Sequence, residues 1–470
     1  SILGIEKPSW EKSSLISDKL SYFKFKDILT KNLDLKQRLS ITGLSTFSYI
    51  MKVNNIVSRI GWPTVRLIIQ KFVTSLGVYF VLAEDIQSAI KKSKKYEDLG
   101  YTFSYDMLGE SAVTKEDAEK YFESYAHAIE HSDYGISVKL SALNPRYEYF
   151  KQSDTHYEDM IEKLSILKDQ CLIDYKASLI IDAEETDRLD LSMMVLERLL
   201  EHGTNRDNMI GVAVQAYQKR AYYVLDHIAD LAKRFNTKIF VRLVKGAYWD
   251  TEIKIAQERG LDFPVFTRKS NTDISYIACA AKMIKYSDHI YSAFATHNPA
   301  TVAAILSLTE LANVNTFEFQ RLYGMGESLH NKLLENGYNS RIYAPVGTYQ
   351  HLLAYLVRRM LENGANTSFV YYHDVQNPFN LMSGNKSENN NIKHWSKLYQ
   401  NRKNSKGWDL SDPTTLNKFL KENKSVKLKS YDNVSSGEID SLYIRAYEDG
   451  FTHWKDTPYN TRNEKVLKFA

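Results

Sequence analysis

The sequence predicts an α/β protein built on a (β/α)8 TIM-like barrel that follows an N-terminal helical region. Short segments rich in β-branched and apolar residues recur between helical segments, roughly 25 to 50 residues apart, which is the rhythm of repeated βα units. Eight such units close most naturally into a barrel whose site lies at the carboxyl ends of the strands. The predicted strands are Ile136–Ala142, Leu179–Ala183, Ile210–Gln215, Ile239–Lys245, Ile290–Ala295, Thr316–Gln320, Arg341–Ala344 and Thr367–Val370.

A doubly wound open sheet is the alternative fold for the same alternation of strands and helices. Such sheets often carry a GxGxxG turn after the first strand, and this sequence has none there. The pair Gly324 and Gly326 comes late in the chain and is weak support for a dinucleotide fold.

Three regions divide the chain. Residues 1–130 carry apolar positions at helical spacing and few strand signals, so we expect a helical arm and domain, with Thr114 capping one helix. Residues 131–372 hold the predicted barrel. Residues 373–470 are expected to be a linker and the truncated start of a following domain, with 376–408, rich in Asn, Ser and Lys, as linker or disordered surface.

Composition narrows the class of protein. Lys and Arg number 61 and Asp and Glu 57, a net charge of +4, so no nucleic-acid surface is expected. The two cysteines form no CxxC pair, and a reduced, cytoplasmic setting is the simplest interpretation. No segment reaches the roughly 18 uncharged apolar residues that a membrane span needs.

The segment from Tyr343 to Asn366 contains the clearest functional signal. It reads as a strand end, a Pro/Gly turn and an apolar helix on which Tyr355, Arg358, Arg359 and Glu362 share one side. Two guanidinium groups flanked by tyrosines suit the carboxylate of a small, partly apolar acid. The alternative is a solvated pair of arginines with a surface ion pair to Glu362, which is common and contributes little.

Polar residues near the predicted strand ends are the other candidates for chemistry. Lys139 and Asp182 lie on neighbouring strands and can neutralise each other, because an ionisable group within a strand is costly unless paired. Arg242 is a second strand cation, whereas Glu184 and Glu185 are expected to be solvated or to cap a helix.

The polar residues at and after the predicted strand ends include more hydrogen-bond donors than acceptors, which suits an anionic cofactor with a pyrophosphate. The donors are Gln215, Arg242, Lys245, Thr267, Arg268, Lys269 and His297. From the residues alone, flavin, nicotinamide and phosphosugar ligands all remain open.

HExxH, EF-hand, Walker A and GxSxG motifs are absent from the sequence, so the corresponding enzyme classes have no support.

Several segments, in order along the chain, closely resemble the proline dehydrogenase domain of bifunctional proline utilization A flavoproteins. The resemblance extends from about residue 60 to 370. The segments are Tyr105-Asp-Met-Leu-Gly-Glu-Ser111, Ser137-Val-Lys-Leu-Ser-Ala-Leu143, Asp182-Ala-Glu-Glu185, Val241-Arg-Leu-Val-Lys-Gly-Ala-Tyr-Trp249, Phe294-Ala-Thr-His-Asn298, Phe317-Glu-Phe-Gln320 and the block from Arg341 to Val370.

The resemblance implies a barrel that holds FAD and oxidises L-proline to Δ1-pyrroline-5-carboxylate, the first step of proline catabolism to glutamate, by hydride transfer to flavin N5. The catalytic residues it implies are Lys139, Asp182, Arg242, Tyr343, Tyr355, Arg358 and Arg359. Those contacting the substrate are Lys139, Leu322, Tyr343, Tyr355, Arg358 and Arg359. Those holding the cofactor are Gln215, Arg242 (near N5), Val244, Gly246, Trp249, Thr267, Thr296 and His297, and no metal is expected.

The resemblance also bears on partners. It implies quinone in the membrane as electron acceptor, reached by peripheral association at the inner face. Relatives of this type carry an aldehyde dehydrogenase domain that is missing here, and the end of the chain resembles its start, so we expect a piece of a longer protein. Two alternatives remain: a non-catalytic interaction module, and a flavoenzyme for another cyclic amino acid such as hydroxyproline.

Overall fold

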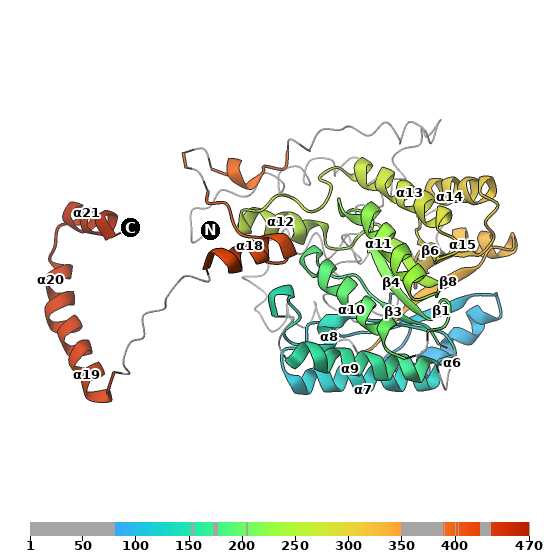
Figure 1. Cartoon of the computed structure of the whole chain (residues 1–470), viewed down its shortest axis with the longest axis horizontal. Coiled ribbons are helices and arrows are strands. Elements are labelled where there is room, and N and C mark those ends of the chain that lie inside the picture. Colours follow the sequence, from blue (N-terminus) through green and yellow to red (C-terminus); the bar gives the residue numbers. More distant parts are fainter. Residues whose placement is uncertain are drawn as a thin grey trace, which may run out of the picture. The chain divides into compact units, whose positions relative to one another are not determined.

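Eight parallel strands close into a barrel in the computed structural model of the chain (Figure 1). Each strand pairs in parallel with the next, and β8 pairs with β1. The strands are β1 (Thr102–Met107), β2 (Gly135–Val138), β3 (Leu179–Ile181), β4 (Ile210–Gln215), β5 (Ile239–Val244), β6 (Ile290–Ala295), β7 (Phe317–Leu322) and β8 (Ser340–Val346). The structure describes residues 80–151, 155–172, 177–203, 205–348, 389, 391–399, 401–402, 404–423 and 434–469.

Helices follow the strands and cover the outside of the barrel (Figure 1). They are α6 (Ile86–Glu97), α7 (Lys115–His131), α8 (Leu140–Leu143), α9 (Thr155–Gln170), α10 (Leu189–Glu201), α11 (Ala221–Arg234), α12 (Trp249–Arg259), α13 (Lys269–Lys285), α14 (Pro299–Leu311) and α15 (Glu327–Glu335), with short 3-10 turns η1 (Tyr149–Lys151) and η3 (Thr186–Arg188). Thr114 caps α7 as predicted, in a reciprocal capping box with Asp117. The (β/α)8 fold class is therefore confirmed.

The prediction of the first strand was wrong. β1 lies within the range expected to be helical, so the barrel starts before residue 131. Its sequence, Thr-Phe-Ser-Tyr-Asp-Met, has one β-branched residue and turns Ser104 and Asp106 toward a polar interior, where they bond residues of other strands. The predicted eighth strand, Thr367–Val370, lies outside the described residues, and the barrel closes without it.

The remaining predicted strands are confirmed, with the predicted ends for Ile210–Gln215 and Ile290–Ala295 and shifted ends for the others. The segment predicted as Ile136–Ala142 is extended only to Val138, and the short helix α8 follows directly. Lys139 is the N-cap residue at this transition, so its side chain lies at the carboxyl end of β2.

Two kinds of packing hold the barrel. Between strands and helices lies a large apolar core that includes Ile136, Val241 and Phe319, each at or below 1% exposure. Inside the barrel, the buried apolar side chains form a small cluster of Ile180, Phe240 and Ala293. Much of the interior is filled by hydrogen-bonded polar side chains, which sets up the candidate site.

The segment after the barrel departs from its predicted linker character. Among its described residues, Ile392 packs against the apolar cluster beside α12, and the Gly407 amide donates to the Gly260 carbonyl at 3.1 Å. Isolated apolar residues within this Asn- and Lys-rich stretch supply the anchors. The 3-10 turn η6 (Trp395–Lys397) lies in it.

Contacts divide the chain into one unit of residues 1–416 and another of residues 417–470, with α18 (Pro413–Asn423) at the boundary. Taken by itself, the second unit contains α19 (Ser436–Arg445), the π-helical turn η7 (Ala446–Phe451), α20 (Thr452–Lys455) and α21 (Tyr459–Phe469). The rings of Tyr443, Tyr447 and Phe451 stack along its surface. Of the helices that the structure describes, none is long and apolar enough to cross a membrane.

Candidate active site

Arg242 lies at the centre of the barrel interior. Its Nη1 donates to Asp182 Oδ1 at 2.6 Å, its Nε to Gln320 Oε1 at 2.9 Å, and its Nη2 to the hydroxyls of Ser104 and Ser137 at 3.0 and 2.9 Å. These contacts use four of the five guanidinium donors and reach four other strands or their ends. The buried charge is therefore fixed in one orientation.

Asp182 joins the cations to a tyrosine. Its second oxygen, Oδ2, accepts a hydrogen bond from the Tyr343 hydroxyl at 2.7 Å and lies 3.7 Å from the Lys139 ammonium. The Arg242 guanidinium also stands 4.9 Å from the centre of the Tyr343 ring. The predicted pairing of Lys139 with Asp182 is present, but it is the longer of the two ion pairs that Lys139 makes.

The nearer partner of Lys139 is Asp106, to which its ammonium donates a short hydrogen bond. Burial alone would lower the pKa of Lys139, but the carboxylates of Asp106 and Asp182 raise it above its ordinary value. Burial, reinforced by the same two carboxylates, raises the pKa of Tyr343. Lys139 is thus a cation and Tyr343 a neutral hydrogen-bond donor at neutral pH.

We name Asp106, Lys139, Asp182, Arg242 and Tyr343 the upper network, because they lie toward the carboxyl ends of the strands. Sequence reasoning missed Asp106, although it lies in a segment that carries the family resemblance. The signal that could have found it is the alternation of Ser104 and Asp106 with aromatic residues in β1, typical of a strand with one polar face.

A second charged pair, Glu318 and Arg341, lies near the amino ends of β7 and β8, and we name it the lower pair. Arg341 Nε and Nη2 donate to the two Glu318 oxygens at 2.7 and 2.9 Å, and Nη1 donates to the Phe103 carbonyl at 2.8 Å. Gln320 links the two sets, since its Nε2 donates to Glu318 at 2.6 Å while its oxygen accepts from Arg242.

Leu322, predicted as a substrate wall, ends β7 and stands opposite Tyr343 in the register of β7 and β8. Its amide donates to His297 Nε2 at 3.0 Å, so this ring nitrogen is the unprotonated one. The carbonyl of the neighbouring Thr296 lies 3.1 Å from Nε2 of the buried His330. Leu322, Thr296 and His297 therefore lie close together beside the upper network.

The other predicted cofactor residues follow the adjacent strands β4, β5 and β6. Gln215 and Val244 face each other in register at the ends of β4 and β5. Trp249 begins α12, and its indole N–H donates to the Phe266 carbonyl at 2.8 Å, next to the buried Thr267. The structure thus brings the described members of this set to one end of the barrel.

Gly246 has φ +127°, and a Cβ there would approach the Tyr217 ring to 2.5 Å, so only glycine allows the loop after β5 to pack against this ring. One local feature of this end suits an anionic dinucleotide. The 17-residue helix α13 begins without a side-chain cap or an acidic residue in its first turn. Such a helix start favours a phosphate.

Lysines stand at the same helix start. Lys269 pairs with Asp273 at 3.1 Å, and Lys245 reaches the same carboxylate from the loop after β5. Four of the seven predicted donors, Lys245, Thr267, Arg268 and Lys269, therefore lie at or near the start of α13.

Of the two expectations for Glu184, solvated or helix-capping, the structure confirms the second. Glu184 is buried, and it accepts hydrogen bonds from the Ser141 amide, at 3.1 Å, and from the Ser141 hydroxyl in the first turn of α8. Burial raises the pKa of Glu184 to about 6, against the opposing effect of Arg188. Its capping contact ties the loop after β3 to the residues that follow Lys139.

Tyr355, Arg358 and Arg359 lie outside the described residues, as does Glu362. Their predicted roles at the substrate carboxylate stay predictions.

The chain is similar in sequence to known proteins. Residues 89–372, more than half of the chain, match the family model described as proline dehydrogenase. The chain is 42% identical over 395 residues to the bifunctional protein PutA of Klebsiella aerogenes, covering 76% of this chain and 30% of that protein. It is 27% identical over 309 residues to proline dehydrogenase 1 of Bacillus subtilis, covering 63% of this chain and 90% of that protein. The chain thus spans about a third of the length of the PutA relatives it matches.

Solved structures show the same likeness. A proline utilization A structure from Bradyrhizobium japonicum has a TM-score of 0.66 and 39% identity, covering 86% of this chain and 43% of that one. The protein from Bdellovibrio bacteriovorus, inactivated by N-propargylglycine, has a TM-score of 0.68 and 26% identity, covering 83% of this chain and 47% of that one.

Proposed function

This chain belongs to the proline dehydrogenase family, and we propose that it oxidises L-proline to Δ1-pyrroline-5-carboxylate with FAD as cofactor. The observation that carries the proposal is the upper network, in which two cations and a neutral tyrosine hydroxyl are held at the carboxyl end of the barrel. Active sites of (β/α)8 enzymes occupy this end.

Lys139 would bind the substrate carboxylate. Its described contacts are one hydrogen bond to Asp106 and a 3.7 Å ion pair to Asp182, whereas an ammonium offers three donors. The two aspartates keep Lys139 charged and aim its side chain. By resemblance, Arg358 and Arg359 would supply the remaining positive charge around the substrate carboxylate, and Tyr355 would form a wall of the substrate pocket. Substitution of either arginine tests its role at the carboxylate.

Leu322 and Tyr343 would bound the apolar ring of the substrate. They face each other across β7 and β8, and the Tyr343 ring is held by its hydroxyl on Asp182 and by the guanidinium of Arg242. Fixing the carboxylate and the ring together orients the one carbon–hydrogen bond that must break, which supplies much of the rate.

FAD, when bound, would accept that hydride. The residues of this chain fit such a cofactor: the α13 start with Lys245, Thr267, Arg268 and Lys269 suits its phosphates, and Gly246 would lie beside it in the loop after β5. Gln215, Arg242, Val244, Trp249, Thr296 and His297 would line the rest of the site. Four of the five Arg242 donors are already used within the barrel, so its part would chiefly be to supply a fixed positive charge to the site.

Delivery of the electrons to quinone, by peripheral contact with the membrane from the cytoplasmic side, is the part of the proposal that rests on family resemblance.

Purified protein tests the proposal directly. We expect a yellow protein whose flavin absorbance bleaches on anaerobic addition of L-proline. Protein that cannot take up FAD would contradict the enzymatic proposal and favour an interaction module. Bleaching by hydroxyproline at the same concentrations as by L-proline would contradict the choice of substrate.

A further inference from the structure

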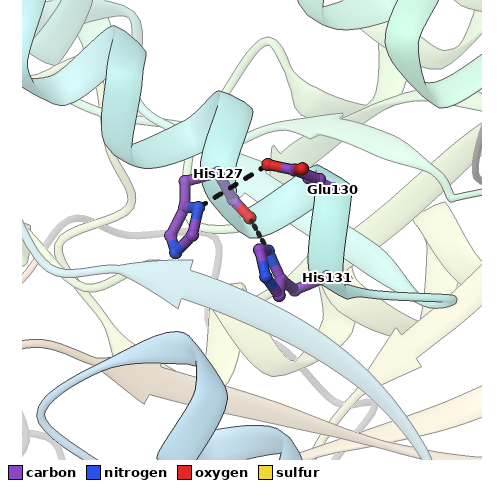
Figure 2. Close-up of side chains that lie close together, drawn as sticks. All are labelled: His127, Glu130 and His131. Carbon is purple, nitrogen blue, oxygen red and sulfur yellow. Dashed lines mark hydrogen bonds and ion pairs between the residues drawn. The ribbon is translucent and has the colours of Figure 1, made fainter.

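We propose that His127, Glu130 and His131, in the last turns of α7, form a surface site for a divalent transition-metal cation such as Zn²⁺, Ni²⁺ or Cu²⁺ (Figure 2). One ligand atom from each residue lies within 4.8 Å of the other two. Imidazole nitrogens prefer these cations, whereas Mg²⁺ and Ca²⁺ prefer oxygen ligands.

Helical spacing sets this geometry. His127 and His131 are four residues apart, so both project from one side of α7, and their ring centres are 4.3 Å apart. His127 Nδ1 lies 3.7 Å from Glu130 Oε2. The side chains of His127 and Glu130 are 51% and 60% exposed, so small rotations can bring the atoms to the roughly 2.0–2.2 Å that zinc ligation requires.

The hydrogen bonding of His131 prepares it as a ligand. Its Nδ1 lies 2.9 Å from the His127 carbonyl oxygen, and because a carbonyl only accepts, Nδ1 carries the proton (Figure 2). Nε2 therefore keeps a lone pair for a metal. Histidines that bind metals usually donate their other ring N–H to a carbonyl or carboxylate in this way.

The position on the helix adds an electrostatic contribution. The carboxyl end of a helix carries partial negative charge, which favours a cation within the last turn. Two imidazoles and a carboxylate leave further coordination positions for water. His131 precedes β2, whereas Lys139 follows it, so the site lies at the opposite end of the strand from the upper network.

Calorimetric titration of the full chain with ZnCl₂ and NiCl₂ tests the site. We expect binding that weakens by about tenfold or more in His127→Ala and in His131→Ala, and less in Glu130→Gln. The control is His453→Ala: His453 makes the same kind of contact, with Nδ1 2.6 Å from the Asp449 carbonyl, but has no second histidine on its turn. Proline oxidation should not change in any of these variants.

A Cu²⁺ electron paramagnetic resonance spectrum adds a structural test. The parent should show coupling to nitrogen ligands that is lost when both histidines are replaced. Equal Zn²⁺ affinity in the parent and in His131→Ala, or equal loss in His453→Ala, would overturn the proposal.

A second, independent observation concerns the segment after the barrel, and this inference rests on the proposed function. We infer that residues 391–399 and 404–407, together with Asn389, form a strap that positions the loops holding FAD. The Asn389 amide donates to the Thr267 hydroxyl at 3.0 Å. Ile392 packs in the same cluster as Trp249, so the strap touches two of the residues proposed to hold the cofactor.

Further contacts fasten the strap to α12 and to the loop that follows it. Gln257 Nε2 donates to the Lys393 carbonyl at 2.5 Å, and His394 Nε2 lies 2.9 Å from Asp262 Oδ1. Hydrogen bonding to His394 lowers the pKa of Asp262. At the other end, Gly407 lies so close to the helix end that a Cβ would stand 1.8 Å from the Arg259 carbonyl oxygen.

That contact makes Gly407→Ala a specific way to lift the strap without altering a cofactor residue. We expect FAD to dissociate from the holoenzyme about tenfold more readily, because the loops lose their preorganisation. Hydrogen exchange in residues 391–399 and 249–267 should rise. The matched control is Gly437→Ala, where a Cβ would meet nothing within 4 Å.

The outcomes separate this inference from the proposed function. If the parent retains no FAD, the proposed function fails. If the parent retains FAD and Gly407→Ala holds it as tightly and exchanges as slowly as Gly437→Ala, the strap inference alone is wrong.

Discussion

The upper network and the lower pair are both charged sets within one barrel, but they differ in what their contacts leave available. In the lower pair, each guanidinium nitrogen of Arg341 donates to Glu318 or to the Phe103 carbonyl, so the chain itself satisfies the cation. In the upper network, the described contacts of Lys139 leave donor capacity for a ligand. A buried cation whose donors are all used by the protein supports the fold, whereas a buried cation with unused donors can also bind a ligand.

Replacing an arginine in each set should give the largest effects and separate their roles. Arg341→Met and Arg242→Met each remove the guanidinium partner of a buried carboxylate, which costs about 3–5 kcal/mol of unfolding free energy. Denaturant titration would measure this. Below the unfolding transition, Arg341→Met should oxidise L-proline as the parent does, and Arg242→Met should not.

Equal rates of L-proline oxidation in Arg341→Met and Arg242→Met would contradict the proposed difference in role between the lower pair and the upper network. Unchanged stability in Arg341→Met would show that the lower pair does not support the fold.

Glu184 should make the upper end of the barrel sensitive to pH. Its pKa is raised from 4.5 to about 6, so the folded state binds more protons in this interval and loses stability as pH rises through it. The loss amounts to about 2 kcal/mol, at about 1.4 kcal/mol per unit of pKa shift. Unfolding free energies of the parent and Glu184→Gln, measured between pH 4 and 7, should differ in slope. Parallel curves would contradict the assignment.

Tyr343→Phe should have the smallest effect. It removes one hydrogen bond to the charged Asp182, worth about 1.5 kcal/mol, and keeps the ring beside Arg242. We expect a modest loss of stability and a raised KM for L-proline, measured by steady-state kinetics with an artificial electron acceptor. A KM equal to that of the parent would remove Tyr343 from the substrate site.

Seven of the eight barrel strands, β2 to β8, could be predicted from sequence because short apolar or β-branched segments recur between helical ones. β1 could not, since it lies in a region whose apolar positions recur at helical spacing, and its inner face is Ser104 and Asp106. The same polarity concealed Asp106 as the partner of Lys139. The pairing of Lys139 with Asp182 was predictable because two adjacent strands place opposite charges at one end.

The strap could not be predicted for a different reason. Its composition resembles that of a disordered linker. Its anchors are single residues such as Ile392 and Gly407, whose role depends on their contacts with α12 and its end, which the local sequence does not reveal. Burial of Glu184 was equally hidden, because it depends on the Ser141 amide from another element.

Rapid-mixing measurement of flavin reduction by L-proline tests the central claim most directly, using Lys139→Met beside Arg341→Met. We predict that the L-proline concentration for half-maximal reduction rises roughly 10- to 100-fold in Lys139→Met, the size of a lost charged hydrogen bond of about 1.5–3 kcal/mol, and stays at the parent value in Arg341→Met. An unchanged concentration in Lys139→Met, or an equal rise in both variants, would contradict the assignment of substrate binding to the upper network.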